Sequence, residues 1–380
     1  MGSSNLQQYL SIYHSRSISD LLFSRVLQEF GSLCQLVAVA DKQLMKMGFE
    51  ESQIQALRGE KAEADIEKLI ARDTCWAETS GNTILTYESN EYPTLLKEIS
   101  CPPPVLYISG NAKLLCTPQI AIVGSRKSSA YGRRNGYWMA HELSNAGITI
   151  SSGMARGIDS QAHRGALDAG GGTIAVIGTG ADRLYPACNK GLAEEIKQQG
   201  AIVSEFALGT APYPYNFPRR NRIIAGLSLG TLVIEAAEKS GSLVSSRIAM
   251  EQNREVFAIP GPISSQNSRG CHQLLREGAK LVECPEDVLE ELKLDLRIKQ
   301  STDDKNGEAG EQLSPDCARS PGETSVKEHR ILRAIDNQGC LPETLSDELG
   351  IEIQELIAQL LDLEIQGRIM VEGGRYFCVN

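Results

Sequence analysis

Four short segments combine glycine with hydroxyl or basic side chains, a combination suited to binding phosphate groups. They are Gly124-Ser125-Arg126, residues 151–159 (Ser-Ser-Gly-Met-Ala-Arg-Gly-Ile-Asp), Gly178-Thr179-Gly180 and Lys239-Ser240-Gly241-Ser242. Each follows an apolar run and precedes a helical pattern, so backbone N–H groups and a helix N-terminus would face an anion there. One such loop indicates little, but four of them with interleaved arginines predict a polyanion site.

Residues 212–228 interleave aromatic rings with arginines. Three prolines predict an extended arm here, followed by an apolar helix. The aromatic residues of the arm and the arginines at the start of the helix are Tyr213, Tyr215, Phe217, Arg219, Arg220 and Arg222. Such rings stack on the bases of a single strand while guanidinium groups hold its phosphates. Three arginines near a helix N-terminus also oppose the helix dipole, a conflict that a bound anion would resolve.

Other chemistry has weaker support. The sequence lacks Gly-x-x-x-x-Gly-Lys-Ser/Thr, and its first candidate loop lacks Gly-x-Gly-x-x-Gly, so neither ATP-driven work nor a bound dinucleotide is expected, and no cofactor is predicted. Asp159 and His163 are four residues apart and could meet near a serine nucleophile, Ser151 or Ser152. In the simpler interpretation, Asp159 caps the helix 160–169 and His163 packs or pairs with it. No carboxylate pair or metal-ligand cluster stands out, so no catalytic residue or metal site is predicted.

The elements that position these loops alternate between strand and helix from about residue 83 to residue 288. The candidate strands are Ile84–Tyr87, Val105–Ile108, Ile120–Val123, Ile148–Ser151, Thr173–Ile177, Ala201–Ser204, Thr231–Ile234 and Val256–Ile259. Helical stretches between them include 160–169, 190–199, 242–252 and 272–278. This order predicts an α/β fold with a doubly wound parallel sheet, whose ligands bind at the carboxyl ends of the strands.

The two ends of the chain differ from this middle part. The first 75 or so residues have helical apolar spacing. Two glycines there would suit a helix-hairpin-helix, although the few basic residues favour a plain helical packing module. A polar stretch at 299–322 predicts a linker, and three helical patterns followed by a Gly-Gly hairpin predict a winged helix. The predicted domains are 1–78 (helical), 79–296 (α/β), 297–322 (flexible linker) and 323–380 (winged helix).

Composition and charge predict a cytoplasmic protein with a local basic region. The 380 residues are 41% hydrophobic and 23% charged, without an apolar run of the ~20 residues that span a bilayer and without an amino-terminal signal pattern. Ten cysteines without a Cys-x-x-Cys pair indicate reduced thiols. The net charge is −10, but residues 118–226 hold 12 Lys+Arg against 7 Asp+Glu, a local +5 that leaves −15 to the remainder. A basic island in an acidic chain is typical of a polyanion site.

Over about residues 92–283 these motifs resemble the DNA-processing (DprA/Smf) family. The matching segments include Gly124-Ser125-Arg126, Ser152-Gly153-x-Ala155-x-Gly157-Ile158-Asp159, Gly178-x-Gly180 with Tyr185-Pro186, residues 217–228, Ser240-Gly241-Ser242-Leu243 and residues 257–261. Two departures are small: Asn253 replaces the usual glycine before Arg254, and Ala207 stands where proline is usual. Neither departure lies in the basic loops.

The resemblance implies an extended Rossmann domain that binds single-stranded DNA and loads the RecA recombinase onto it, in recombination and natural transformation. It also implies a homodimer formed through this domain, without enzymatic activity. Together with the chemistry of the residues, it makes the expected DNA-binding positions Gly124, Ser125, Arg126, Gly153, Arg156, Phe217, Arg219, Arg220, Asn221, Arg222, Gly241 and Ser242.

Two other functions stay open at this point. The Ser-Gly-Ser-Leu turn also resembles the lysine-decarboxylase-like phosphoribohydrolases, which split nucleoside monophosphates, but Val244-Ser245-Ser246 follows where those enzymes have a glutamate. Alternatively, the winged helix could make the chain a duplex-DNA-binding regulator. Against this, the helix expected to read DNA, 352–366, carries four carboxylates and no basic residue. Its apolar positions have core spacing, namely Ile353, Leu356, Ile357, Leu360, Leu361 and Leu363.

Overall fold

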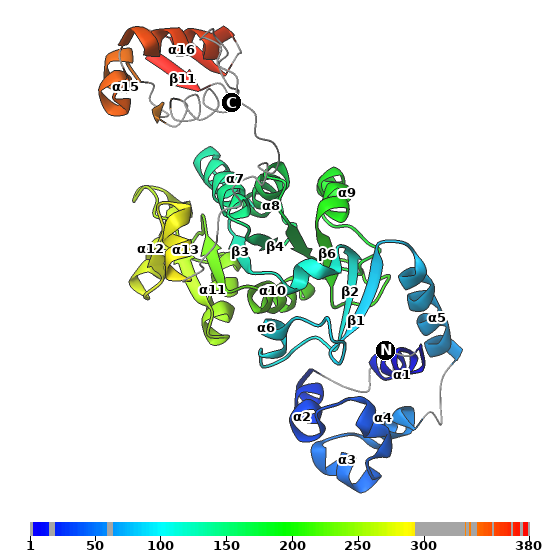
Figure 1. Cartoon of the computed structure of the whole chain (residues 1–380). Coiled ribbons are helices and arrows are strands. Elements are labelled where there is room, and N and C mark those ends of the chain that lie inside the picture. Colours follow the sequence, from blue (N-terminus) through cyan, green and yellow to red (C-terminus); the bar gives the residue numbers. More distant parts are fainter. Residues whose placement is uncertain are drawn as a thin grey trace, which may run out of the picture. The chain divides into compact units, whose positions relative to one another are not determined.

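The computed structural model divides into two compact units, Met1–Asp303 and Asp304–Asn380 (Figure 1). The residues that it describes are 3–14, 20–58, 64–292, 331, 334–335, 340–351, 353–365, 368–372 and 375–378. The predicted linker 297–322 lies outside the described residues, as do most of residues 323–339 at the start of the predicted winged helix.

The first unit is built around a nine-stranded sheet with the order β1-β2-β6-β5-β4-β3-β7-β8-β9. Its strands are β1 (Asn82–Thr86), β2 (Val105–Gly110), β3 (Gln119–Val123), β4 (Thr149–Ser152), β5 (Thr173–Val176), β6 (Ala201–Ser204), β7 (Gly230–Val233), β8 (Glu255–Ala258) and β9 (Lys280–Leu281). The strands from β6 to β9 are parallel, which confirms the predicted doubly wound sheet.

The sheet differs from the prediction at its two edges. β1 and β2 pair antiparallel with each other, and β2 pairs antiparallel with β6. Between them lies only the four-residue helix α6 (Thr94–Lys97), so this connection is not the helical crossover that parallel neighbours need. The short strand β9 was not predicted, because its two residues are exposed and have no apolar pattern.

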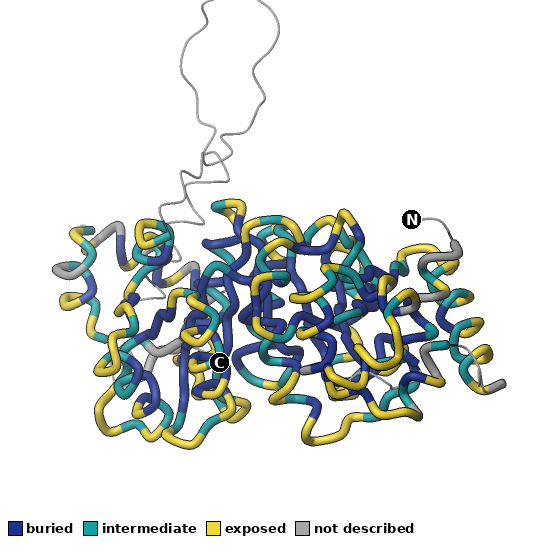
Figure 2. Tube along the Cα trace, turned by 90° about the horizontal axis from the view of Figure 1, so that it is seen from below, coloured by how far each residue is buried: buried dark blue, intermediate teal, exposed yellow. Residues whose placement is uncertain are grey.

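Helices cover both faces of the sheet, and the buried segments gather at its centre (Figure 2). The helices of the α/β part are α7 (Ala130–Asn145), α8 (Ile158–Asp168), α9 (Lys190–Gln199), α10 (Asn216–Leu227), α11 (Gly241–Glu251), α12 (Arg269–Arg276) and α13 (Pro285–Glu291), with the short turns η2 (Ala112–Cys116), η3 (Ala187–Asn189) and η4 (Gln266–Ser268). Ile120 and Ile122 of β3 pack with α7, α8 and α13, whereas Ala121 and Val123 pack with α10 and α11. Alternate side chains of β3 therefore point into the hydrophobic cores on the two faces of the sheet.

The amino-terminal part is helical, as predicted. Its helices are α1 (Ser3–His14), α2 (Asp20–Phe30), η1 (Cys34–Ala38), α3 (Asp41–Met47), α4 (Glu51–Leu57) and α5 (Ala64–Glu78). Gly48, at φ +101°, is the left-handed C-cap that ends α3. The predicted boundary at residue 78 falls between α5 and β1, but the helices share a core with Tyr107 of β2. The boundary therefore stays a prediction.

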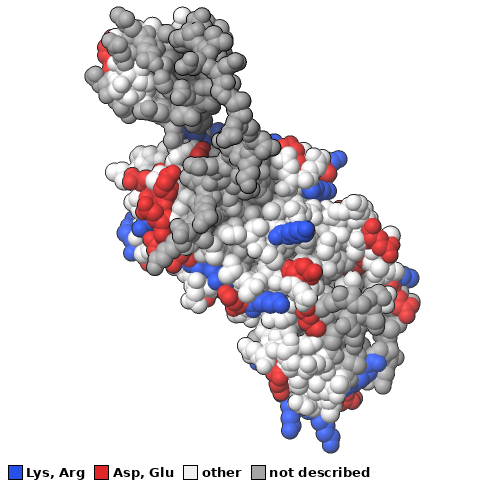
Figure 3. All heavy atoms as spheres, viewed as in Figure 1, with Lys and Arg blue, Asp and Glu red and all other residues white. Residues whose placement is uncertain are grey.

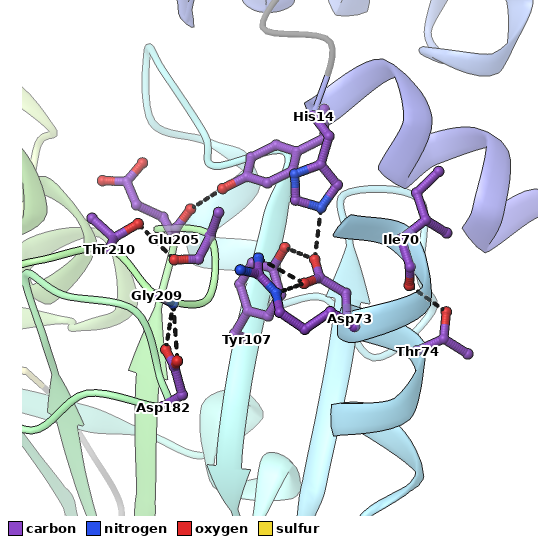
Figure 4. Close-up of polar contacts among 12 residues, drawn as sticks. His14, Ile70, Asp73, Thr74, Tyr107, Asp182, Glu205, Gly209 and Thr210 are labelled. Carbon is purple, nitrogen blue, oxygen red and sulfur yellow. Dashed lines mark hydrogen bonds and ion pairs between the residues drawn. The ribbon is translucent and has the colours of Figure 1, made fainter. Parts of the chain in front are cut away.

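A buried carboxylate fastens these helices to the sheet (Figure 4). Asp73 of α5 is fully buried, and its Oδ2 lies 2.8 Å from His14 Nε2 at the end of α1. The hydroxyl of Tyr107 donates to the same carboxylate, and Arg72 Nη2 lies 3.2 Å from it. Because an unpaired buried carboxylate is costly, this cluster favours one position of α1 and α5 against β2.

The second unit contains α15 (Pro342–Leu349), α16 (Ile353–Ile365) and the antiparallel pair β10 (Ile369–Glu372) and β11 (Arg375–Cys378), which agrees with the predicted winged helix. Of the six apolar residues of α16 that were expected to be buried, three are buried. Leu356, Leu360 and Leu363 are buried. In contrast, Ile353, Ile357 and Leu361 are exposed by 36%, 46% and 55% and form a stripe along one side of the helix.

Candidate nucleic-acid interface

The loops after β3, β4 and β7 meet at the carboxyl edge of the sheet, where the strand order reverses beside β3. The N–H of Ser125 donates to the backbone oxygen of Glu235 at 2.8 Å, and the N–H of Ile158 donates to that of Ser125 at 3.3 Å. Gly157 makes the second approach possible, because a Cβ there would lie 2.3 Å from the oxygen of Ser125. Two of the four predicted loops, 124–126 and 151–159, are therefore in direct contact, and the segment that follows β7 joins them through Glu235. This is the position where doubly wound sheets bind ligands.

Glu235 holds the first loop in place and was not singled out as a site residue in the sequence. Its side chain is buried and accepts hydrogen bonds from the N–H of Ser129 at 2.9 Å and from the Ser129 hydroxyl at 2.5 Å. Ser129 is in turn the N-cap of α7. A carboxylate directly after a buried strand is the sequence signal that could have indicated this anchor.

Two of the predicted glycines have packing reasons. A Cβ at Gly124 would lie 2.5 Å from the Ile158 side chain, and one at Gly153 would lie 2.4 Å from Arg220 Nη1. At Gly241, a Cβ would meet nothing within 4 Å. Close packing therefore explains why Gly124 and Gly153 have no side chain. Packing does not explain the glycine at position 241, which would let a ligand approach the backbone closely.

Two carboxylates of the chain itself, Glu205 and Asp159, balance part of the charge of the three arginines of α10, and the bound anion stays a prediction. Arg222 pairs with the carboxylate of Glu205, which is buried at the end of β6, and Arg219 lies 3.6 Å from it. Arg220 is buried, donates to the backbone oxygen of Val176 and faces Asp159 beside Gly153. These contacts offset the repulsion between the three charges and the helix dipole.

Burial shifts both members of the Arg220–Asp159 pair. It lowers the pKa of Arg220 to about 10, while the charge of Asp159 acts in the opposite direction. It raises the pKa of the Asp159 carboxyl, which the Arg220 charge and the backbone N–H of Ala155 counteract. Arg220 is therefore charged at neutral pH, and its partner is a side chain rather than a ligand.

Phe217 lies in the first turn of α10, which begins at Asn216, and not in an extended arm as predicted. Pro218 is tolerated in that turn because no intrahelical bond needs its N–H. The Phe217 ring packs on Gly178, where a Cβ would lie 2.9 Å away, and its centroid is 5.6 Å from that of Tyr185. The guanidinium of Arg126, an exposed residue of the first loop, lies 6.0 Å from the ring centroid of Phe217. The basic and aromatic groups of Arg126, Tyr185 and Phe217 thus form one rim.

The remaining predicted residues lie around this rim. Arg156 is exposed, and its Nε donates to the Cys188 sulfur at 3.1 Å. Asn221 is half-buried on α10. Ser242 is buried, and its hydroxyl lies 2.7 Å from that of Ser240. On the face shown in Figure 3, most lysine and arginine side chains of the described residues stand singly among uncharged and acidic ones.

The structure does not assemble the hydrolytic alternative. His163 is fully buried, and its Nδ1 lies 2.7 Å from the Thr173 hydroxyl rather than near Asp159. The Ser151 and Ser152 hydroxyls donate to Gln119 Oε1 at 2.5 Å and to the Ile122 backbone oxygen at 2.6 Å. Asp159 lies inside the first turn of α8, whose N-cap is Gly157, so its predicted capping role is wrong.

The described residues contain no group of three or more His, Cys, Asp or Glu side chains that could hold a metal ion. They also contain no helix long and apolar enough to cross a bilayer.

The fold and the rim define a class, an extended Rossmann-like α/β unit joined to a winged helix. Within that class, residues 83–293 match the family described as DNA recombination-mediator protein A, and residues 315–375 match the DprA winged helix domain. The first match covers more than half of the chain, so the chain belongs to this family. The resemblance inferred from the motifs is confirmed.

Relatives and solved structures agree with this assignment. The chain is 40% identical over 310 residues to the protein Smf of Escherichia coli (strain K12), covering 81% of this chain and 80% of that protein. It is 48% identical over 200 residues to the DNA processing protein DprA of Streptococcus pneumoniae (strain R6), covering 53% of this chain and 71% of that protein. The two relatives carry the names Smf and DprA of this family, which supports the same assignment.

Two solved structures share the fold. The Streptococcus pneumoniae DprA structure has a TM-score of 0.65 at 37% identity and covers 75% of this chain and 97% of that one. A Helicobacter pylori DprA structure, described as giving insight into a single-stranded DNA binding mode, has a TM-score of 0.50 at 32% identity and covers 55% of this chain and 95% of that one.

Proposed function

We propose that the chain binds single-stranded DNA across the rim formed by Arg126, Tyr185 and Phe217. The observation that carries this proposal is the exposed guanidinium of Arg126 beside the ring of Phe217, next to a tyrosine whose surface is 48% exposed. A phosphate paired with the arginine would leave its base next to the rings. The Helicobacter pylori relative, described by its single-stranded DNA binding mode, supports the choice of ligand.

The predicted DNA-binding residues divide into two groups under this proposal. Arg126, Arg156, Phe217, Arg219 and Gly241 are exposed or half-buried and touch the strand. The other predicted residues support those five and do not touch the strand. They are Gly124, Ser125, Gly153, Arg220, Asn221, Arg222 and Ser242. Buried ion pairs suit this second role, because they fix α10 against the loops.

The wider proposal follows the family. The chain loads the RecA recombinase onto the strand that it holds, in recombination and natural transformation, as a cytoplasmic homodimer joined through domain 79–296. The helical domain 1–78 and the winged helix 323–380 flank this domain. Filament formation by RecA on single-stranded DNA, measured with and without the chain, tests the loading step.

Fluorescence anisotropy with single- and double-stranded oligonucleotides over a series of salt concentrations tests DNA binding itself. Single strands should bind more tightly, and log K should fall with log salt by about 0.7 for each phosphate contact. Equal affinity for the two forms would refute the proposal. Release of free base from nucleoside monophosphates would favour the phosphoribohydrolase alternative.

Replacing Phe217 with alanine tests the stacking part of the site. The loss of one stacked base should cost about 1–3 kcal/mol of binding free energy and leave the salt slope nearly unchanged. Phe217→Tyr keeps a ring on Gly178 and serves as the matched control. A Phe217→Ala variant that is folded by circular dichroism and binds like the wild type would place the bases elsewhere.

A further inference from the structure

A hollow of about 730 Å³ lies between the amino-terminal helices and the start of α10. Its walls are Tyr13 and His14 of α1, Arg72 of α5, the segment 205–211 after β6, and Tyr213, Tyr215 and Arg219 around the start of α10. We propose that this hollow, here called the arm hollow, binds a nucleotide of the single strand that leaves the rim. The inference rests on the proposed function and extends its site to the amino-terminal helices.

The arm hollow has an exposed aromatic platform. The rings of Tyr213 and Tyr215 are parallel within 6°, with their centroids 5.5 Å apart. Their exposed fractions are 48% and 69%. Parallel rings at this distance already stack on each other, so a base would add to the outer face of the pair rather than enter between them. Base–aromatic stacking of this kind is independent of sequence.

The first turn of helix α10 lies between the rim loops and the arm hollow. Phe217 and Arg220 face Gly178 and Gly153 of the rim loops. Arg219 and Asn216 line the arm hollow, and Asn216 Nδ2 also donates to the backbone oxygen of Gly178 at 3.0 Å. A strand that crosses the first turn of α10 therefore passes directly from Phe217 to the tyrosine pair.

Two arginines from different helices, Arg72 of α5 and Arg219 of α10, line the arm hollow and would bind a phosphate. The side chains of Arg72 and Arg219 are 40% and 45% exposed. Each is oriented by a buried carboxylate, Asp73 for Arg72 and Glu205 for Arg219, while Arg219 also lies 5.7 Å from the ring centroid of Phe206. A guanidinium carries five N–H donors, so an arginine that pairs with a carboxylate can also donate to a phosphate oxygen.

The position of the outer wall follows from the Asp73 cluster (Figure 4). His14 and Tyr107 both contact Asp73, and the hydroxyl of Tyr13 donates to the backbone oxygen of Glu205 at 2.8 Å. These bonds join α1 and α5 to both β2 and the segment after β6. The volume of the hollow lies within the range of about 300–1,000 Å³ that small ligands occupy.

The test compares short and long single strands. Competition anisotropy is measured at one salt concentration with oligothymidines of about 2 and about 20 nucleotides, of which the short one is long enough only for one phosphate at Arg126 and one base at Phe217. Tyr215→Ala should weaken binding of the long strand about tenfold and leave the short strand unchanged. Tyr215→Phe, the matched control, keeps the stacking ring and should bind both as the wild type does. Because Tyr215 is exposed, its truncation leaves no cavity in the core, and circular dichroism verifies folding.

Other outcomes would overturn the inference, and they can be told apart. If the wild type prefers single strands and Tyr215→Ala binds both lengths normally, the strand does not enter the arm hollow, although the proposed function stands. An equal loss for both lengths would place Tyr215 in the rim. Saturable quenching of tyrosine fluorescence by thymidine monophosphate, without a length effect, would assign the hollow to a free nucleotide. A wild type without single-strand preference would refute the proposed function as well.

Discussion

Arg126 differs from the arginines of α10 because it is exposed, whereas Arg220 and Arg222 are mostly covered. Arg126→Ala should therefore weaken single-strand binding and reduce the salt slope by about 0.7, the share of one phosphate contact. The midpoint of thermal unfolding should stay unchanged. Arg126→Lys keeps the charge and should retain the slope. A normal slope in the alanine variant, measured by anisotropy, would show that no phosphate pairs with this residue.

The buried imidazole of His163 leads to a prediction about how the free energy of unfolding depends on pH. Burial, with a smaller contribution from the Arg220 charge, lowers the pKa of His163 to about 3, from 6.5. Its Nε2 has no hydrogen-bond partner among the described residues, so a proton there would be buried without an acceptor. Between pH 6.5 and 3 the unfolded chain binds this proton and the folded chain does not, so the free energy of unfolding decreases as the pH falls.

The contribution of this residue is at most about 1.4 kcal/mol per pH unit. His163→Gln should show a flatter dependence of unfolding free energy on pH, measured by urea denaturation, and normal DNA binding at pH 7. Identical pH slopes for the two proteins would contradict the assignment of a buried neutral imidazole. Loss of DNA binding in a folded variant would return His163 to the functional site.

At this scale the sequence indicates which residue types gather but not how they are paired. The arginines of α10 and the phosphate-type loops were visible in the sequence because they are local motifs. Their partners Asp159 and Glu205 are distant in sequence, and a lone carboxylate after a strand has no distinctive pattern. Asn253 is an intermediate case. It replaces a glycine of the family pattern, and its φ of +55° lies in the left-handed region that asparagine tolerates.

Helix α10 is held to the end of β6 by the pair between Arg222 and Glu205, whose side chains are 13% and 2% exposed. Arg222→Ala removes the nearer of the two arginines that pair with this buried carboxylate, and the expected loss in unfolding free energy is about 3 kcal/mol. Arg222→Ala with Glu205→Gln should recover part of this loss, because the buried charge is gone. Urea denaturation measures both. A stable single variant that binds DNA weakly would instead make Arg222 a direct contact.

The predicted elements agree with the structure where the sequence has continuous apolar runs. They differ at the proline-rich start of α10 and in the pairing direction of β1. All eight predicted strands exist, because buried parallel strands are continuous apolar runs. The start of α10 was placed too late because prolines suggested an extended arm, although Pro218 fits a first helical turn. The antiparallel direction of β1 could not be predicted, since pairing partners are set by the connection and not by the strand's own residues.

Across the whole molecule, the sequence indicates where positive charge gathers but not which of the charged side chains face solvent. The segment 118–226, which carries a net positive charge, includes Arg126 and Phe217 of the rim. Much of that charge is used internally, since Arg220 and Arg222 are balanced by Asp159 and Glu205. Which arginines face solvent depends on contacts between β6, α8 and α10, and these form only in the folded chain.

The winged helix leads to the last prediction. A helix that enters the major groove needs positive or neutral polar side chains. Instead, α16 presents Ile353, Ile357 and Leu361 on its exposed side, and its residues include no lysine or arginine. Such an apolar stripe is suited to a protein surface and not to a nucleic acid.

A truncated chain ending near Leu296 should therefore keep most of its affinity for single strands in anisotropy titrations, because the compact unit 1–303 holds the complete rim. A full-length chain with Ile357→Ser and Leu361→Ser is the matched control, and it should bind single strands as the wild type does. A truncated chain that is folded and dimeric but binds no DNA would contradict this assignment. The winged helix would then be the DNA reader, and the chain would be a regulator of duplex DNA.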